Sequence, residues 1–377
     1  MVYLRRVKCL VTGGAGFVGS TLALLLQRDV AGIDVTAFDN LRRRGSELAL
    51  DRLRAGGVTF RHGDVRSADD LSDAGPFDIL IECSAEPSVH AGYDGSPAYV
   101  LDTNLTGAAR CLDAARRYDA SVVFLSTSRV YSIPALVSLP LERQGDRLEL
   151  HAGASGPGWS ARGIIESFPT SGPRSLYGTS KLAAELLVEE YHAMYGLRTV
   201  VNRCGLIAGP WQMGKADQGL IAFWAARHEY GGELSFTGFG GEGLQVRDVL
   251  HVVDLYDLVR VQLSNLTRLS GQVYNVGGGP ANSVSLVELT EKCRQRTGRT
   301  IAMGRVHDTR EFDIPYYVTD NARVSAATGW APSRGVDIVL DDVFSWLRAH
   351  RAALEHVVAP AGHAQQPAPA GGTRQGA

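Results

Sequence analysis

The sequence predicts a doubly wound α/β fold, in which helices cover both faces of a parallel β-sheet. Short apolar runs such as VKCLVT (7–12) and SVVFLS (121–126) alternate with longer segments of helical pattern up to residue 204. Uninterrupted apolar strands separated by helices are typical of a parallel sheet that is buried on both faces. The turn TGGAGFVG (12–19), which joins the first strand to the first helix, also favours this fold.

The expected elements follow one another in a regular order. Strands are expected at 7–12, 35–38, 58–62, 77–83 and 121–126, with helices at 17–28 and 97–118 between them. A long helix at 177–195 and a strand at 198–204 continue the alternation, and shorter helices are expected near 251–264, 285–297 and 334–350. Residues 132–175 are rich in Gly, Pro, Ser and Arg, which predicts a functional loop or a local insertion.

The glycine turn has the features of a dinucleotide-binding site. Gly13 permits a tight turn, Gly16 lets the backbone approach a pyrophosphate, and Gly19 allows the helix to pack closely. A strand precedes the turn and a helix follows it, which is the context such a motif requires. The first half of the chain is therefore predicted to be a Rossmann-type domain.

Acidic residues at the ends of the next strands indicate which dinucleotide binds. Asp39 stands where a carboxylate can accept hydrogen bonds from the adenosine ribose, and its charge repels a 2′-phosphate. This favours NAD, although the arginines at 42–44 leave tolerance of NADP open. Asp64 follows the third strand and is either an adenine contact or an ordinary helix N-cap.

Length and composition set the outer limits. The chain has 377 residues, 45% of them hydrophobic and 21% charged, and a net charge of −2, which favours neither nucleic acid nor an anionic membrane as partner. We expect a Rossmann domain at 1–204 with about 244–278, a smaller α/β substrate domain at about 205–243 and 279–357, and a disordered tail at 358–377. Five scattered cysteines indicate reduced thiols in a cytoplasmic protein without a metal site. Neither a membrane span nor a signal peptide is expected.

A candidate catalytic set lies further along the chain. Tyr177 and Lys181 are four residues apart on a predicted helix and therefore share a face. A nearby ammonium lowers the pKa of a tyrosine from about 10 toward the working range, which gives a proton carrier for the oxidation of a hydroxyl to a carbonyl. Thr127, at the end of the strand at 121–126, is expected on the crevice side of the sheet and can bind the same oxygen. Tyrosine and lysine at this spacing often occur by chance, but a dinucleotide site in the same chain favours the catalytic interpretation.

Five motifs together resemble a known family. TGGAGFVG, FDNLRRRG, LSTSRVY, YGTSK and LQVRDVLHVVD occur in the order found in the extended short-chain dehydrogenase/reductases, and the chain is similar to their NAD-dependent epimerase/dehydratase family over about residues 5–350. FDNLRRRG (38–45), GKADQG (214–219) and GLQVRDVLHVVDL (243–255) most resemble its CDP-tyvelose (CDP-paratose) 2-epimerase branch. In ECSAEPSV, Glu82 replaces the histidine that relatives often carry after the fourth strand.

The resemblance implies a full set of site residues. It implies Thr127, Tyr177 and Lys181 as the catalytic residues. Contacts to NAD are implied for Gly13, Ala15, Gly16, Phe17, Val18, Gly19, Asp39, Asn40, Arg42, Asp64, Val65, Ser84, Ala85, Glu86, Asn104, Ser126, Tyr177, Lys181 and Arg203. Contacts to a nucleotide-diphosphate sugar are implied for Glu86, Ser128, Arg129, Gln212, Gln218, Gly219, Gln245, Arg247 and Arg310, of which Arg247 and Arg310 can clamp the diphosphate.

The resemblance further implies a nucleotide-sugar epimerase, with C2 favoured as the inverted carbon, that oxidises its substrate transiently and returns the hydride. Dehydratases of the family place Asp-Glu directly after the catalytic threonine, where this chain has Ser128 and Arg129, so water loss is disfavoured. A 4-epimerase, a net NAD(P)-dependent reductase or dehydrogenase, and a non-catalytic NAD-binding regulatory protein are the alternatives. A homodimer or a dimer of dimers, formed through the helices at 97–118 and 177–195, is expected from the same resemblance.

Overall fold

The computed structural model of the chain describes residues 6–93, 95–215 and 218–358. The tail predicted at 358–377 lies outside the described residues, apart from Val358 at the end of the last helix. No helix in the described part of the chain is long and apolar enough to cross a membrane.

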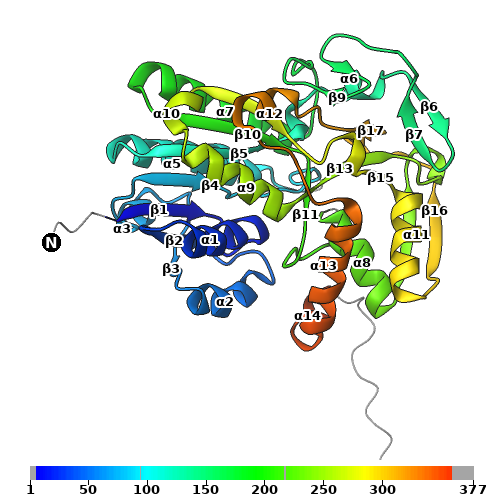
Figure 1. Cartoon of the computed structure of the whole chain (residues 1–377), viewed down its shortest axis with the longest axis horizontal. Helices are drawn as coiled ribbons and strands as arrows, with labels where there is room; N and C mark the ends of the chain where they lie inside the picture. The colour runs from blue at the N-terminus through cyan, green and yellow to red at the C-terminus, as the bar shows by residue number, and fades with distance from the viewer. Residues whose placement is uncertain (1–5, 94, 216–217, 359–377) are drawn as a thin grey trace, which may run out of the picture.

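A seven-stranded parallel sheet forms the centre of the larger unit, which confirms the predicted doubly wound α/β fold (Figure 1). Its strand order is β14-β10-β5-β4-β1-β2-β3, so the chain runs outward from β1 to β3 and then returns to the other side of β1. The direction of winding therefore reverses between β1 and β4, and ligands bind at such a switch point, beyond the carboxyl ends of the strands. The strands are β1 (Val7–Thr12), β2 (Ile33–Asp39), β3 (Thr59–His62), β4 (Ile79–Glu82), β5 (Ser121–Thr127), β10 (Thr199–Cys204) and β14 (Gln272–Val276).

Helices cover both faces of this sheet because side chains on successive strand residues point to opposite sides. Val11 packs with apolar residues of α1 and α9 on one face, whereas its neighbour Leu10 packs with those of α3, α5 and α7 on the other. The helices of this larger unit are α1 (Phe17–Asp29), α2 (Leu50–Ala55), α3 (Ala68–Asp73), α4 (Ala98–Leu101), α5 (Gly107–Arg117), α7 (Leu176–Tyr195), α9 (Val252–Leu263), α10 (Leu266–Leu269) and α12 (Ala322–Thr328).

Two of the expected helices differ in an informative way. The helix predicted at 97–118 is divided by a π-helical turn at Asp102–Thr106, which separates α4 from α5 and brings Asn104 to the loop after β4. Such turns often occur at functional sites. The helix predicted at 177–195 forms as α7, which begins after its N-cap Ser175 and ends at Gly196 in the left-handed conformation (φ 67°).

A second, smaller α/β unit lies at the carboxyl end of the central sheet (Figure 1). Its four-stranded sheet contains β11 (Leu206–Ala208), β13 (Val246–His251), β15 (Ser283–Ser285) and β17 (Tyr316–Tyr317), and β12 (Glu233–Thr237) pairs with β16 (Ala302–Val306). The helices α8 (Leu220–Tyr230), α11 (Leu286–Thr297), α13 (Val336–Ala349) and α14 (Arg351–Val358) form an apolar cluster with these strands. The division of the chain into two domains at the expected boundaries stays a prediction.

Residues 132–175, expected to be a loop or an insertion, form an ordered insertion. They contain α6 (Ile133–Val137) and the small hairpins β6 (Leu141–Gln144) with β7 (Arg147–Leu150) and β8 (Trp159–Ser160) with β9 (Gly163–Ile164). The backbone N–H of Ile164 donates to Val318 (2.8 Å), and the carboxylate of Glu166 accepts from the backbone N–H of Asn275 (2.8 Å). The insertion is thus attached to the carboxyl edge of the sheets.

Candidate functional site

A cavity of about 1150 Å³ lies beyond the carboxyl ends of β1, β2, β4 and β5, between the two units. This is the position that the strand order predicts for a ligand. Most of the residues that the sequence assigned to the site line it, namely Gly13, Ala15, Gly16, Phe17, Val18, Gly19, Asp39, Asn40, Arg42, Val65, Ser84, Ala85, Glu86, Thr127, Ser128, Arg129, Tyr177, Gln212, Gln218, Gly219, Gln245, Arg247 and Arg310. Asp64, Asn104, Ser126, Lys181 and Arg203 are not among the lining residues.

The glycine turn leaves no room for side chains. Gly13 adopts φ +62°, and a Cβ on it would lie 2.8 Å from the backbone oxygen of Cys83. A Cβ on Gly19 would lie 2.2 Å from the backbone oxygen of Gly13, so the first turn of α1 packs directly on the turn that precedes it. The N-terminus of α1 consequently faces the cavity with bare backbone, which suits the pyrophosphate of a dinucleotide.

Asp39 ends β2 at the rim of the cavity. Its Oδ2 accepts a hydrogen bond from the backbone N–H of Ala15 (3.1 Å), and its Oδ1 accepts one from that of Leu41 (2.8 Å). Burial raises the pKa of this carboxyl, and the backbone hydrogen bonds partly offset the rise. Each carboxylate oxygen can accept a second hydrogen bond, so the group fits the ribose hydroxyls that the sequence assigned to it.

Near Asp39, two arginines pack against the aromatic ring of Tyr99, which lines the cavity. The guanidinium of Arg42 lies 3.9 Å from the centre of the Tyr99 ring, and that of Arg66 lies 5.0 Å from it. Asp64 pairs with Arg66 (2.7 Å), which holds the pKa of Asp64 well below its usual range, and also accepts from the amide of Asn40 (2.9 Å). Asp64 therefore fixes its neighbours, while Arg42 and Tyr99 line the cavity.

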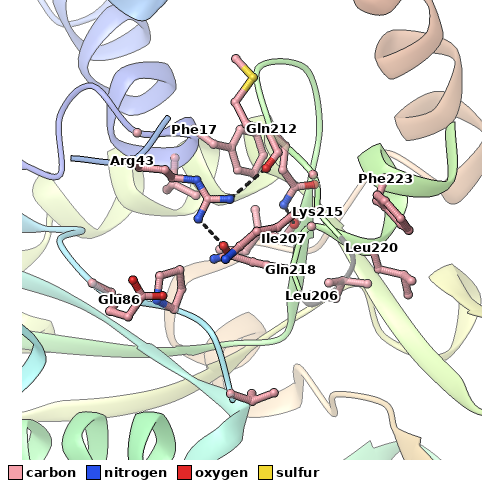
Figure 2. Close-up of a pocket in the computed structure, with 18 of the residues that line it drawn as sticks. Phe17, Arg43, Glu86, Leu206, Ile207, Gln212, Lys215, Gln218, Leu220 and Phe223 are labelled. Atoms are coloured by element: carbon pink, nitrogen blue, oxygen red, sulfur yellow. Dashed lines mark hydrogen bonds between the residues drawn. The ribbon is translucent and has the colours of Figure 1, made fainter. Parts of the chain in front are cut away.

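The loop after β4 is held by a buried amide. The side chain of Asn104 accepts from the backbone N–H of Glu86 (2.8 Å) and donates to the backbone oxygen of Glu86 (3.1 Å) and to the hydroxyl of Ser180 (3.1 Å). Asn104 thus shapes the cavity from behind. Its two bonds to the backbone of Glu86 leave that carboxylate directed into the cavity (Figure 2).

Thr127 and Tyr177 meet at the inner end of the cavity. Both side chains line the cavity, and the hydroxyl of Thr127 acts on Tyr177 so as to favour its phenolate. Burial raises the pKa of Tyr177, and the charge of Lys181, the hydroxyl of Thr127 and the charge of Arg129 act in the opposite direction. The ammonium of Lys181 is 3.5 Å from a carboxylate oxygen of Glu82, and both side chains are 3% exposed. The three predicted catalytic residues are therefore brought together, with a carboxylate beside them.

Ser126 and Arg203 lie next to Thr127 but do not line the cavity. The hydroxyl of Ser126 hydrogen-bonds the carboxylate of Glu185, and Arg203 pairs with the same carboxylate (2.7 Å). Arg203 also donates to the hydroxyl of Tyr131 (3.3 Å). These contacts join β5, α7 and β10 into a buried network, and contacts of Ser126 and Arg203 with a cofactor stay a prediction.

Two neighbouring arginines, Arg129 and Arg247, line the part of the cavity that faces the smaller unit. Arg129 donates to the backbone oxygen of Phe312 (3.1 Å) and Arg247 to that of Ile314 (2.6 Å), so the two guanidiniums flank Asp313. Burial and the charge of Arg129 lower the pKa of Arg247 to about 9. Among the described residues, neither guanidinium has a carboxylate within 4.0 Å. Arg310 lines the same region, which can therefore bind an anion.

The loop that follows β11, in the smaller unit, lines the cavity on the side facing the larger unit. Arg43 reaches across to the carboxamide oxygen of Gln218 and to the backbone oxygen of Met213 (2.9 Å; Figure 2). Gln212 donates to the backbone oxygen of Ile207 (2.9 Å), and Gln245 donates to that of Thr237 (3.1 Å). Gln218 is thus held by Arg43 of the larger unit, and both side chains line the cavity (Figure 2).

The set predicted from the sequence lacked many residues of this site, among them a buried acid and three charged or aromatic side chains that line the cavity. Glu82, Tyr99, Arg43 and Asp313 contact predicted site residues or line the cavity. A signal existed for Glu82, because an acid that ends an apolar strand next to the switch point is unusual. No local pattern distinguishes Tyr99 or Asp313 from ordinary surface residues.

A family model describes most of this arrangement. The model of the NAD dependent epimerase/dehydratase family matches residues 9–277, from the first strand through β14. The chain belongs to this family. Its cofactor is accordingly NAD, and the glycine turn and the carboxylate of Asp39 fit that cofactor.

Relatives within the NAD dependent epimerase/dehydratase family have several activities. The chain is 29% identical to the CDP-paratose 2-epimerase of Salmonella typhi, over 90% of this chain and 99% of that one. It is 30% identical to the dTDP-glucose 4,6-dehydratase of Streptomyces niveus, over 94% and 96%. Among solved structures, UDP-glucose 4-epimerase of Thermus thermophilus in complex with NAD superposes with a TM-score of 0.70 at 26% identity, covering 91% of this chain and 99% of that one.

Proposed function

We propose that this protein is a nucleotide-sugar epimerase that inverts C2 of its substrate and keeps its NAD bound throughout. The observation that carries the proposal is the environment of Thr127 and Tyr177. Both side chains line the cavity, and the residues directly after Thr127 are Ser128 and Arg129, which also line it and supply a cation and no acid. Loss of water from a sugar needs a proton donor at the departing hydroxyl, so this arrangement favours epimerisation over dehydration.

The chain's own residues handle the proton. Tyr177 as a phenolate, stabilised by the charge of Lys181, removes the proton of a sugar hydroxyl, and Thr127 donates a hydrogen bond to the same oxygen. The glycine turn and Asp39 would hold NAD, which would supply a hydride acceptor and donor for the carbon that bears this hydroxyl. The resulting keto sugar presents its other face, and Tyr177 gives the proton back to the oxygen. No oxidant is consumed, because the hydride and the proton both return to the sugar.

The preference for C2 rests on Arg129 and Arg247. In a nucleoside-diphosphate sugar the phosphate is attached to C1, so C2 is its ring neighbour and C4 lies across the ring. Arg129 is two residues from Thr127, and its charge acts on Tyr177. A phosphate held by Arg129 and Arg247 therefore brings C1 close to the catalytic hydroxyls, which favours C2 as the reacting carbon.

We also propose a cytoplasmic homodimer or dimer of dimers. All five cysteines are unpaired in the structure, which is consistent with a reducing compartment. On α7, Leu186 is 57% exposed and Met194 is 68% exposed, so this helix offers an apolar surface to a second copy.

The proposal is tested by a substrate panel. The protein is incubated with CDP-, UDP-, GDP-, ADP- and dTDP-hexoses, and the products are followed by NMR. Interconversion of a pair of C2 epimers without added NAD is expected. Inversion at C4 would refute the choice of C2 and would make the protein a 4-epimerase. Steady production of NADH, with no epimer formed from any of the five classes of substrate, would refute the proposal that the protein is an epimerase.

A further inference from the structure

Lys181, the candidate catalytic residue that does not line the cavity, forms a buried ion pair. Lys181 on α7 and Glu82 at the end of β4 approach to 3.5 Å, with both side chains 3% exposed. The other oxygen of the Glu82 carboxylate accepts hydrogen bonds from the backbone N–H (3.0 Å) and the hydroxyl of Ser84. Glu82 does not line the cavity, so within the described structure its carboxylate faces protein groups.

The sheet fixes this carboxylate between two other strands. In the parallel register, Glu82 is opposite Thr12 on β1 and Phe124 on β5. The ammonium of Lys181 lies 4.2 Å from the centre of the Phe124 ring, so it is confined between a carboxylate and an aromatic face. A buried ion pair generally adds little to stability, since desolvation cancels most of the attraction. Its place beside Tyr177 gives it another use.

The charges around Tyr177 can be enumerated from each packed element. The thiols of Cys83 on the loop after β4, Cys111 on α5 and Cys204 on β10 face the pair, and burial raises the pKa of each, so they stay neutral. Glu185, one turn further along α7, is paired with Arg203. The charges of Lys181 and of Arg129, in the turn after β5, both act on Tyr177. Glu82 carries the charge that is paired with Lys181.

We propose that Glu82 is a positioning residue, which anchors the ammonium of Lys181 behind Tyr177 and moderates how strongly that ammonium favours the phenolate. With Glu82 ionised, Glu82, Lys181 and the neutral phenol have no net charge, and ionising Tyr177 adds a buried negative charge. Without the carboxylate, the same step starts from a net positive charge and ends neutral, which is easier in a buried site. The inference rests on the proposed role of Tyr177 as the base.

The direct test is the ionisation of Tyr177 in Glu82→Gln, which requires no substrate. The absorbance of tyrosinate is titrated with pH in the full-length protein, and the Tyr177 component is obtained as the part that is missing after Tyr177→Phe. Glu82→Gln should lower the apparent pKa of that component by roughly one unit. Because relatives often have histidine at this position, Glu82→His is the second variant. Its imidazole is neutral at alkaline pH, so it should shift the titration in the same direction.

A matched control separates positioning from mere loss of a buried pair. Asp254 is also buried and paired, with Arg334 at 2.5 Å, but in the α9 region, away from Tyr177. Asp254→Asn should reduce stability and leave the Tyr177 titration unchanged. If Glu82→Gln or Glu82→His titrates as wild type, or shifts upward, the inference is overturned. Once a substrate is known, the acid limb of the pH profile of kcat should move to lower pH in the same variants. The titration of Tyr177 needs no substrate, so it tests the role of Glu82 even if the substrate panel yields no epimer.

Discussion

The substitution Arg129→Met probes the phosphate site that underlies the C2 assignment. Arg129 lines the cavity, and its guanidinium donates to the backbone oxygen of Phe312 (3.1 Å). A hydrogen bond to a charged group contributes about 1.5–3 kcal/mol, which corresponds to roughly 10- to 150-fold in a dissociation constant. The charge of Arg129 also lowers the pKa of Arg247, so its removal relieves a repulsion between the two guanidiniums. We therefore expect the lower part of that range, roughly 10- to 30-fold.

The assay compares nucleotides that differ by one phosphate. Calorimetric titration with CDP and CMP, or with UDP and UMP if uridine binds more tightly, isolates the phosphate that would carry the sugar. Arg129→Met should weaken binding of the diphosphate by the stated factor and that of the monophosphate by less than about threefold. Arg54→Met, at a side chain that is 79% exposed, is the control for a lost surface charge. Equal losses for both nucleotides, or no loss for either, would refute the assignment.

Three further predictions concern the base, the cofactor turn and the buried network, and a fourth concerns cofactor choice. Tyr177→Phe should lower kcat by about 10²–10⁴-fold while the dissociation constant of NADH, followed by its fluorescence, stays the same; activity near wild type would remove Tyr177 from its role. Gly19→Ala introduces a Cβ 2.2 Å from a backbone oxygen, so NAD should be lost from the purified protein. The ratio of nucleotide absorbance to protein absorbance measures this loss. Glu185→Ala leaves Arg203 buried without its partner and should reduce the free energy of unfolding in urea by about 3–5 kcal/mol; a change below about 1 kcal/mol would contradict the network. Asp39→Asn removes the charge that repels a 2′-phosphate, so the ratio of NADP to NAD affinity should rise.

The central sheet could be predicted from the sequence because its signals are local. Each strand is a short apolar run, and the glycine turn marks the first crossing from strand to helix. The strand order then places the carboxyl ends of β1, β4 and β5 at one switch point. Thr127 and Tyr177, 50 residues apart in the sequence by their numbers, meet there because both the strand and the helix end or begin at that edge.

The contacts of Lys181 and Arg203 could not be predicted in this way. Glu82 and Lys181 are 99 positions apart, and their contact depends on how α7 docks against β4 and β5. Arg203 matches a family position for cofactor contact, but its guanidinium is engaged by Glu185 and does not line the cavity. The hairpin of β8 and β9 also lacks a sequence signal, because strands this short are held by contacts with distant residues such as Val318.

The central claim is that one hydride leaves the sugar, stays in the protein and returns to the same carbon. The measurement that tests it most directly is conversion of the accepted nucleotide sugar in D₂O, with the product examined by NMR and mass spectrometry. We predict a product that carries no deuterium on the inverted carbon, formed without net production of NADH. Deuterium on that carbon would contradict the account, because it would mean that the proton at the inverted centre came from solvent.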